Sequence, residues 1–181
     1  MNESVLNRIC DGGNASLLCE DNDGLPLARG VDLDRFMGDW YVIAAIPTLL
    51  ERGIENAVET YQRRDDGWID TTFRYSRGAR ERSWQFKGKV LDECNGAVWG
   101  MQIVWPMLAD YRILYVDDAY RQTVIGRRKR DYAWIMSRTP ELAHSDLFER
   151  VRLLRECGYD TARLRRMVHR PRAAVGTAAA D

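Results

Sequence analysis

Between residues 40 and 138, the chain alternates short apolar and aromatic runs with polar segments of the kind that form turns. Residues 68–76 show the pattern clearly, because Ile69, Thr71, Phe73 and Tyr75 share one face when every second position is taken. Asp-Gly and Asn-Gly pairs separate some of the runs, since glycine adopts the positive φ that tight turns require. The pattern predicts eight β-strands, at residues 40–46, 58–64, 68–76, 82–91, 97–104, 111–116, 122–126 and 132–138.

The spacing of the apolar residues changes after residue 138. Thr139-Pro140-Glu141 favours the start of a helix, with a threonine N-cap, a proline in the first helical position and an acid beside it. An apolar stripe with helical spacing follows at Leu142, Leu147, Phe148, Val151 and Leu154. Gly158 is expected to end this helix, which would pack its apolar stripe on the outside of the sheet.

These elements predict an all-β fold: an eight-stranded antiparallel up-and-down barrel with one C-terminal α-helix packed outside. Closure would pair both edges of the sheet, and eight strands enclose enough space for one small ligand. A chain of 181 residues is expected to form one domain. Residues 1–30 and 171–181 lack apolar periodicity, which predicts a flexible leader and a flexible tail around a barrel domain at residues 31–170.

Gly38-Asp39-Trp40 precedes the first predicted strand, and Arg138 ends the last one. A closed barrel would bring these two strands together. The Arg138 guanidinium could then stack on the Trp40 indole and still donate to nearby carbonyls, which a lysine could not do. Gly38, Trp40 and Arg138 are therefore predicted to be structural residues that mark the closed end of the barrel.

The barrel region carries a series of motifs in a fixed order: Gly38-Asp39-Trp40-Tyr41, Glu51-Arg52-Gly53, Tyr61-Gln62-Arg63-Arg64-Asp65-Asp66-Gly67, Asp117-x-x-Tyr120-Arg121 and Arg130-Asp131-Tyr132-x-Trp134-Ile135-x-Ser137-Arg138-Thr139-Pro140. Over residues 31–170 this series resembles the bacterial lipocalins, in particular the outer-membrane lipoprotein lipocalins and the plant temperature-induced lipocalins. The resemblance implies a calyx that binds a fatty acid or lysophospholipid, with a role in membrane maintenance or stress. It also implies a homodimer and a peripheral membrane contact.

Two departures from the family pattern stand out. The lipobox cysteine of the lipoprotein members is absent, and Arg127-Arg128-Lys129 replaces the Gly-Pro that often precedes the final motif. No export signal is visible, which predicts a cytoplasmic location, whereas the resemblance implies the outer membrane or periplasm.

Two-residue alternation from Trp40 and Arg138 predicts which side chains face the barrel interior. The predicted ligand-binding residues on this face are Val42, Ala44, Phe73, Tyr75, Trp84, Phe86, Tyr111, Ile113, Tyr115, Trp134 and Met136. The alternative for each of them is packing within the core or against the outer helix.

Up-and-down connectivity places alternate loops at the end opposite Trp40, and two of these loops are strongly basic. They contain Arg77 and Arg80 in one, and Arg127, Arg128, Lys129 and Arg130 in the other. We expect Arg77, Arg127 and Arg128 to bind the carboxylate or phosphate of an amphiphile at the mouth of the barrel. The alternative is that these charges only keep the loops soluble.

The sequence shows no catalytic, metal or cofactor motif. Zero net charge gives the whole molecule no attraction to nucleic acid, so we expect no nucleic-acid partner. The basic run Arg163-Leu164-Arg165-Arg166 is predicted to be a solvated edge. The four cysteines are expected to be free thiols, with a disulfide between Cys94 and Cys157 as the alternative.

The sequence thus predicts a carrier or scavenger of lipid or another small hydrophobic ligand, without enzymatic activity. One alternative is an isomerase-like enzyme on the same fold, which would require a titratable group inside the calyx. The other is a scaffold that binds proteins through its outer surface.

Overall fold

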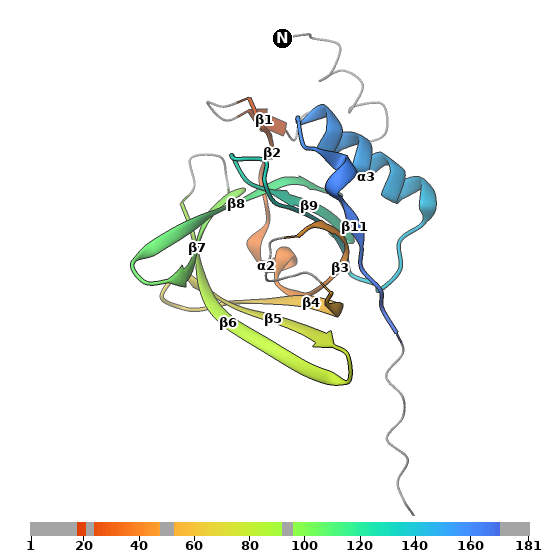
Figure 1. Cartoon of the computed structure of the whole chain (residues 1–181). Helices are drawn as coiled ribbons and strands as arrows, with labels where there is room; N and C mark the ends of the chain where they lie inside the picture. The colour runs from red at the N-terminus through yellow and green to blue at the C-terminus, as the bar shows by residue number, and fades with distance from the viewer. Residues whose placement is uncertain (1–17, 21–23, 48–52, 92–95, 171–181) are drawn as a thin grey trace, which may run out of the picture.

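The computed structural model describes residues 18–20, 24–47, 53–91 and 96–170 of the chain. Sequential strands pair antiparallel, and the last pairs with the first, so that a closed eight-stranded barrel results (Figure 1). The barrel strands are β3 (Gly38–Ile46), β4 (Glu55–Arg63), β5 (Trp68–Arg77), β6 (Arg80–Val90), β7 (Val98–Val104), β8 (Met107–Val116), β9 (Gln122–Gly126) and β10 (Ala133–Ser137). The predicted fold class is confirmed.

The remaining elements surround the barrel. Helix α3 (His144–Glu156) lies along its outside (Figure 1), and the short helix α2 (Leu33–Phe36) precedes β3. A 3-10 helix, η3 (Thr161–Arg163), leads into the two-residue strand β11 (Arg165–Arg166), which pairs with β3. Strands β1 (Leu18–Glu20) and β2 (Pro26–Ala28) form a hairpin. Among the described residues, no helix is long and apolar enough to cross a bilayer.

The start of the outer helix differs from the prediction. Helix α3 begins at His144, and its N-cap residue Ala143 makes no side-chain cap. The Thr139 hydroxyl donates to the Glu141 carbonyl at 2.8 Å, so it stabilises a turn before the helix instead of capping it. The predicted end is confirmed, because Gly158 follows the C-cap with a φ of 84°.

Part of the predicted leader belongs to the folded domain. Leu25 and Leu27 are fully buried, and β2 contacts β8. The prediction of a flexible segment is therefore wrong for residues 24–30, where the apolar side chains are few but completely covered. Residues 1–17, 21–23 and 171–181, where the rest of the leader and the tail fall, lie outside the described residues.

The predicted Trp40–Arg138 contact is present at the closed end. The Arg138 guanidinium carbon lies 3.8 Å from the centroid of the Trp40 ring. The same guanidinium donates to the carbonyls of Arg35 at 2.7 Å and of Met37 and Asp39 at 2.8 Å. Arg138 thus binds the end of α2 to the start of β3, and satisfies carbonyls that the short helix leaves without partners.

The closed half of the interior is filled by aromatic rings with a small polar cluster among them. Trp99 stacks on Tyr111 with 5.4 Å between ring centroids. The Tyr61 hydroxyl donates to Glu59 at 2.5 Å and hydrogen-bonds the Tyr111 hydroxyl. Glu59 is 1% exposed. Burial raises the pKa of both Tyr61 and Tyr111 well above the usual value, and the nearby Glu59 carboxylate is the second cause of this increase.

Replacement of Arg138 by lysine should lower the free energy of unfolding by about 2–4 kcal/mol, because the variant loses the stacked guanidinium and most of its carbonyl bonds. Urea unfolding monitored by circular dichroism measures the change. Arg74→Lys is the matched control, since Arg74 makes one exposed ion pair with Asp39 at 3.2 Å and should change stability by less than about 1 kcal/mol. Equal losses in the two variants would contradict the structural role of Arg138.

The Tyr61 and Tyr111 hydroxyls should stay protonated in the folded protein when ordinary tyrosines ionise, near pH 10. Because their folded pKa values are raised, their contribution to stability is complete below about pH 10 and is lost as the pH rises further. Absorbance at 295 nm checks this. Near pH 10, the folded variant Tyr61→Phe/Tyr111→Phe should show the same increase in absorbance as the folded parent protein. The variant should show a smaller increase only when the two proteins are compared in the unfolded state. A smaller increase in the folded variant than in the folded parent would contradict the prediction.

Candidate ligand pocket at the open end

Two β-bulges decide which side chains face the barrel interior. In antiparallel pairs, residues directly opposite each other point to the same face. Trp134 pairs with Ala45 and Met136 with Val42, so one extra residue of β3 lies between the two pairs. In β8, Ile113 pairs with Ile125 but Tyr115 pairs with Val124, so an extra residue lies there too. Simple alternation therefore fails at both places.

Two predicted ligand residues point outward for this reason. Ala44 pairs with Ile135, which pairs with Val124, and Val124 pairs with Tyr115. The ring centroid of Tyr115 lies 4.0 Å from the guanidinium carbon of Arg150 on α3, which identifies this face as the outer one. The predicted inward positions of Ala44 and Tyr115 are wrong, and Ala45 takes the inward position instead.

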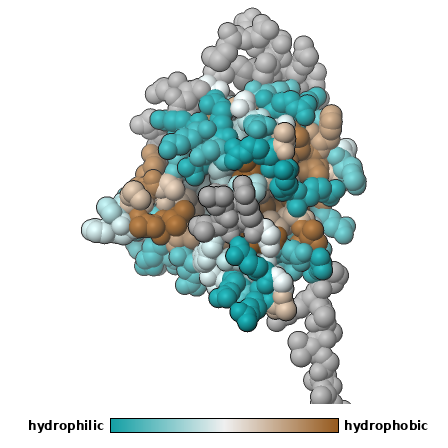
Figure 2. Space-filling view, in the orientation of Figure 1, coloured by the Kyte–Doolittle hydropathy of each residue, from teal (hydrophilic) through white to brown (hydrophobic). Residues whose placement is uncertain are grey.

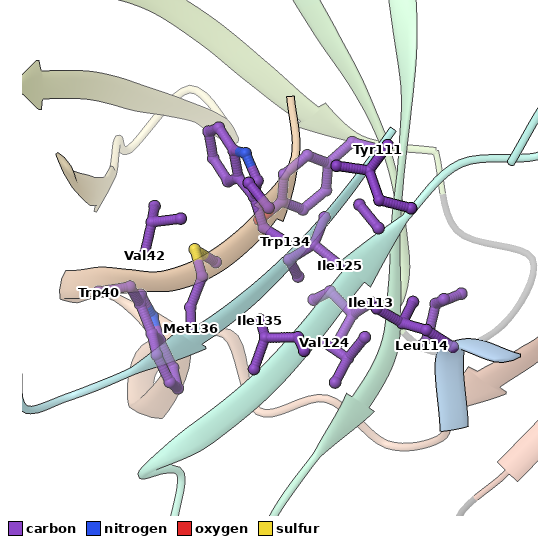
Figure 3. Close-up of a cluster of buried hydrophobic side chains, with 14 of the residues drawn as sticks. Trp40, Val42, Tyr111, Ile113, Leu114, Val124, Ile125, Trp134, Ile135 and Met136 are labelled. Atoms are coloured by element: carbon purple, nitrogen blue, oxygen red, sulfur yellow. The ribbon is translucent and has the colours of Figure 1, made fainter. Parts of the chain in front are cut away.

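The other predicted wall residues share the inner face. Phe73 stacks on Trp134 with 5.2 Å between ring centroids, and it also contacts Tyr75 at 5.5 Å and Trp84 at 5.9 Å. Phe86 is partly buried on the same face of β6 as Trp84. Figure 3 shows the cluster that contains Val42, Tyr111, Ile113, Trp134 and Met136.

A pocket with a volume of about 590 Å³ lies at the open end of this interior. Its apolar wall comes from the barrel, through Val42, Ala45, Phe73 and Trp134. Pro47, Gly53 and Ile54, from the connection between β3 and β4, form a second side. The third side is the C-terminal segment, which contributes Arg163, Arg165, Arg166 and Met167. Of the predicted ligand residues, Val42, Phe73 and Trp134 line this pocket.

The C-terminal segment reaches the pocket because β3 and β4 separate halfway along their length. Their pairing covers only Gly38–Tyr41 of β3. Beyond that point, the Met167 amide donates to the Ile43 carbonyl, and the Asn56 amide donates to the Val168 carbonyl, both at 2.9 Å. An ion pair of 3.0 Å joins Arg170 to Glu55. The segment is thus hydrogen-bonded on both sides, to β3 and to β4.

Three arginines give this side of the pocket a positive charge. The Arg165 guanidinium donates to the carbonyls of Ala162 and Leu164 at 2.9 and 3.0 Å. Within the described part of the chain, Arg163 and Arg166 make no ion pair, and both are exposed. The sequence predicted only a solvated edge for this run. The pairing of β11 with β3 brings it to the pocket, and local sequence patterns contain no signal for that long-range contact.

The arginines that were predicted to bind the ligand lie elsewhere. Arg77 is exposed at the tip of the β5–β6 hairpin. Arg127 forms an ion pair with Asp131 at 3.0 Å, and its amide donates to the Tyr159 hydroxyl at 2.8 Å. The Arg128 amide donates to Asp110 at 2.6 Å. These loops are at the open end as predicted, but none of Arg77, Arg127 and Arg128 lines the pocket.

The described residues offer no obvious metal site or reactive thiol. No group of three histidine, cysteine or carboxylate side chains in them could hold a metal ion. Cys157 is a free, buried thiol, and burial raises its pKa to about 12, so it stays protonated at neutral pH. The alternative disulfide would join Cys157 to Cys94, which lies outside the described residues.

Comparison with known proteins agrees with this architecture. The family model described as a lipocalin-like domain matches residues 31–169. The outer membrane lipoprotein Blc of Escherichia coli K12 is 28% identical over 142 residues, which cover 77% of this chain and 80% of that protein. Temperature-induced lipocalin-1 of Arabidopsis thaliana is 30% identical over 150 residues, which cover 77% and 80% of the two chains.

Solved structures show the same fold at low sequence identity. Lobster apocrustacyanin A1 superposes with a TM-score of 0.62 and 14% identity, over 77% of this chain and 81% of that one. Insecticyanin from the tobacco hornworm Manduca sexta gives a TM-score of 0.61 and 13% identity over the same shares. Lipocalins bind small hydrophobic ligands. The matched family model, the related sequences and the closed barrel together show that this chain belongs to the lipocalin family.

Proposed function

We propose that this lipocalin binds a single-chain anionic amphiphile, a fatty acid or a lysophospholipid. The observation that carries the proposal is the composition of the pocket, in which an apolar wall faces an arginine-rich one. The acyl chain would lie against Val42, Phe73 and Trp134. The carboxylate or phosphate would meet Arg163 and Arg166, because a planar guanidinium donates two parallel hydrogen bonds to such groups.

The two walls would contribute differently to binding. Burial of an acyl chain contributes about 0.8 kcal/mol per CH₂ group, so the apolar wall would dominate the affinity. The arginines are exposed, so they would add orientation and a smaller, salt-sensitive contribution. The packed closed half limits the depth of the site, since Tyr61, Trp99 and Tyr111 fill the space beneath it.

An isomerase-like activity would need a titratable group in contact with the ligand. Glu59 is such a group inside the barrel, but it is buried, bound to Tyr61 and absent from the pocket wall. This placement favours binding over catalysis. The names of the relatives, an outer membrane lipoprotein and a temperature-induced lipocalin, support a role in membrane maintenance or stress.

Loss of the positive wall should weaken binding of an anionic amphiphile. At low salt, Arg163→Ser/Arg166→Ser should reduce the affinity for a fluorescent fatty acid by about fivefold to tenfold, and added salt should shrink the difference. A fluorescence titration measures both effects.

Arg127→Ser/Arg128→Ser is the matched control, because it removes the same charge from the same end of the barrel but away from the pocket wall. It should bind within about twofold of the parent. Equal losses in the two double variants would point to a general charge effect, and no loss in either would overturn the arginine contact.

A larger side chain in the apolar wall should weaken binding of the acyl chain. Val42→Phe places a larger side chain into the pocket and should lower the affinity by more than about tenfold, because several CH₂ groups lose their site. Isothermal titration calorimetry measures this, and thermal unfolding checks that the variant is folded. Binding at the parental affinity by a folded variant would place the acyl chain elsewhere.

A further inference from the structure

A buried carboxylate, that of Glu59, faces the barrel interior. Charged side chains normally lie on the surface, and hydrophilic residues cover much of the face that Figure 2 shows. Among the described residues, Glu59 and Arg112 are the two charged side chains that are buried, at 1% and 5% exposed. Arg112 lies on the outer face of β8, where it binds Asp110 at 2.8 Å. Glu59 lies on the inner face of β4, between Trp40 of β3 and Phe73 of β5.

Glu59 lies directly beneath the pocket. Residues directly opposite each other in an antiparallel pair have their Cβ atoms about 5 Å apart, and Phe73, which is opposite Glu59, lines the pocket. On the other side, Trp40 is opposite Glu59, and Val42, two residues further along β3, lines the pocket too. Glu59 is therefore one layer of side chains deeper than the pocket wall. The pocket has a negative charge beneath its floor and the exposed arginines of the C-terminal segment at its mouth.

Two tyrosines stabilise the negative charge of Glu59. The Tyr61 hydroxyl donates to the carboxylate at 2.5 Å, so Tyr111 must donate the hydrogen bond between the two hydroxyls. Hydrogen bonds to the charged form of a carboxylate favour that form. Each hydroxyl has one proton, and both protons are used within the cluster. A ligand that reaches the floor therefore meets an acceptor and a negative charge.

The stability of the fold gives no reason for a charge at this position. Burial of a carboxylate costs free energy, and buried ionic groups can often be replaced by apolar side chains of similar volume without loss of stability. The inner-face neighbours of Glu59 are large aromatic side chains, those of Trp40, Tyr61 and Phe73. An effect of Glu59 on what enters the pocket explains the charge better than packing does.

We propose that Glu59 determines which amphiphiles the pocket accepts and which way they lie, an inference that rests on the proposed function. A carboxylate beneath the floor repels a second negative charge and attracts a positive one, and apolar surroundings leave this interaction poorly screened. Accepted ligands have one anionic group, which lies at the arginines, and an uncharged or positively charged end, which lies toward Glu59. Chains with an acid at both ends are rejected.

Three ligands with the same chain length and different inner ends test this proposal: dodecanoic acid, dodecanedioic acid and ω-aminododecanoic acid. Isothermal titration calorimetry of the full chain at neutral pH measures their affinities. The parent protein should bind the amino acid about tenfold more tightly than the diacid. Glu59→Gln keeps an oxygen that accepts from Tyr61 but removes the charge. In this variant the diacid should gain and the amino acid should lose about threefold to tenfold in affinity, while dodecanoic acid should change by less than about twofold.

Asp70→Asn is the matched control for the loss of one negative charge. Asp70 lies on the outer face of the neighbouring strand β5, with an ion pair of 3.7 Å to Arg64. Water and salt screen a charge at this position, so all three affinities should stay within about twofold of the parent values. Thermal unfolding checks that both variants are folded.

The parent protein alone can overturn the proposal, so the result does not depend on whether a variant folds. A parent that binds dodecanoic acid, but binds the diacid as tightly as the amino acid, would overturn the role of Glu59 and leave the proposed function intact. Equal changes in Glu59→Gln and Asp70→Asn would do the same, because they would show a general effect of charge. Failure of the parent to bind dodecanoic acid would overturn the proposed function and this inference with it.

Discussion

Strand β3 changes its hydrogen-bonding partner halfway along its length, and the pocket depends on this change. Its first half pairs with β4, and its second half pairs with β11. On its other edge it pairs with β10 from Tyr41 to Ile46, which closes the barrel. The separation of β3 from β4 leaves backbone groups that need partners, and the C-terminal segment supplies them. That same segment brings the arginines to the pocket wall.

The two ends of the barrel differ in how tightly they are packed. At the closed end, Arg138 donates to several carbonyls and stacks on Trp40, and the interior beside it is filled by aromatic rings. At the open end, apolar residues line a pocket and others lie on the surface. Tight packing at one end fixes the strands, so the other end can remain open without loss of the fold.

Local patterns in the sequence predicted the barrel, since strand alternation and turn residues are short-range signals. The Trp40–Arg138 contact followed from the predicted closure, which brings the first and last strands together. The errors arose where long-range geometry decides. The bulges turned Ala44 and Tyr115 outward, and alternation gives no warning of an extra residue. The basic run after α3 has no local strand pattern either. Only its pairing with β3 shows that Arg163 and Arg166 reach the pocket.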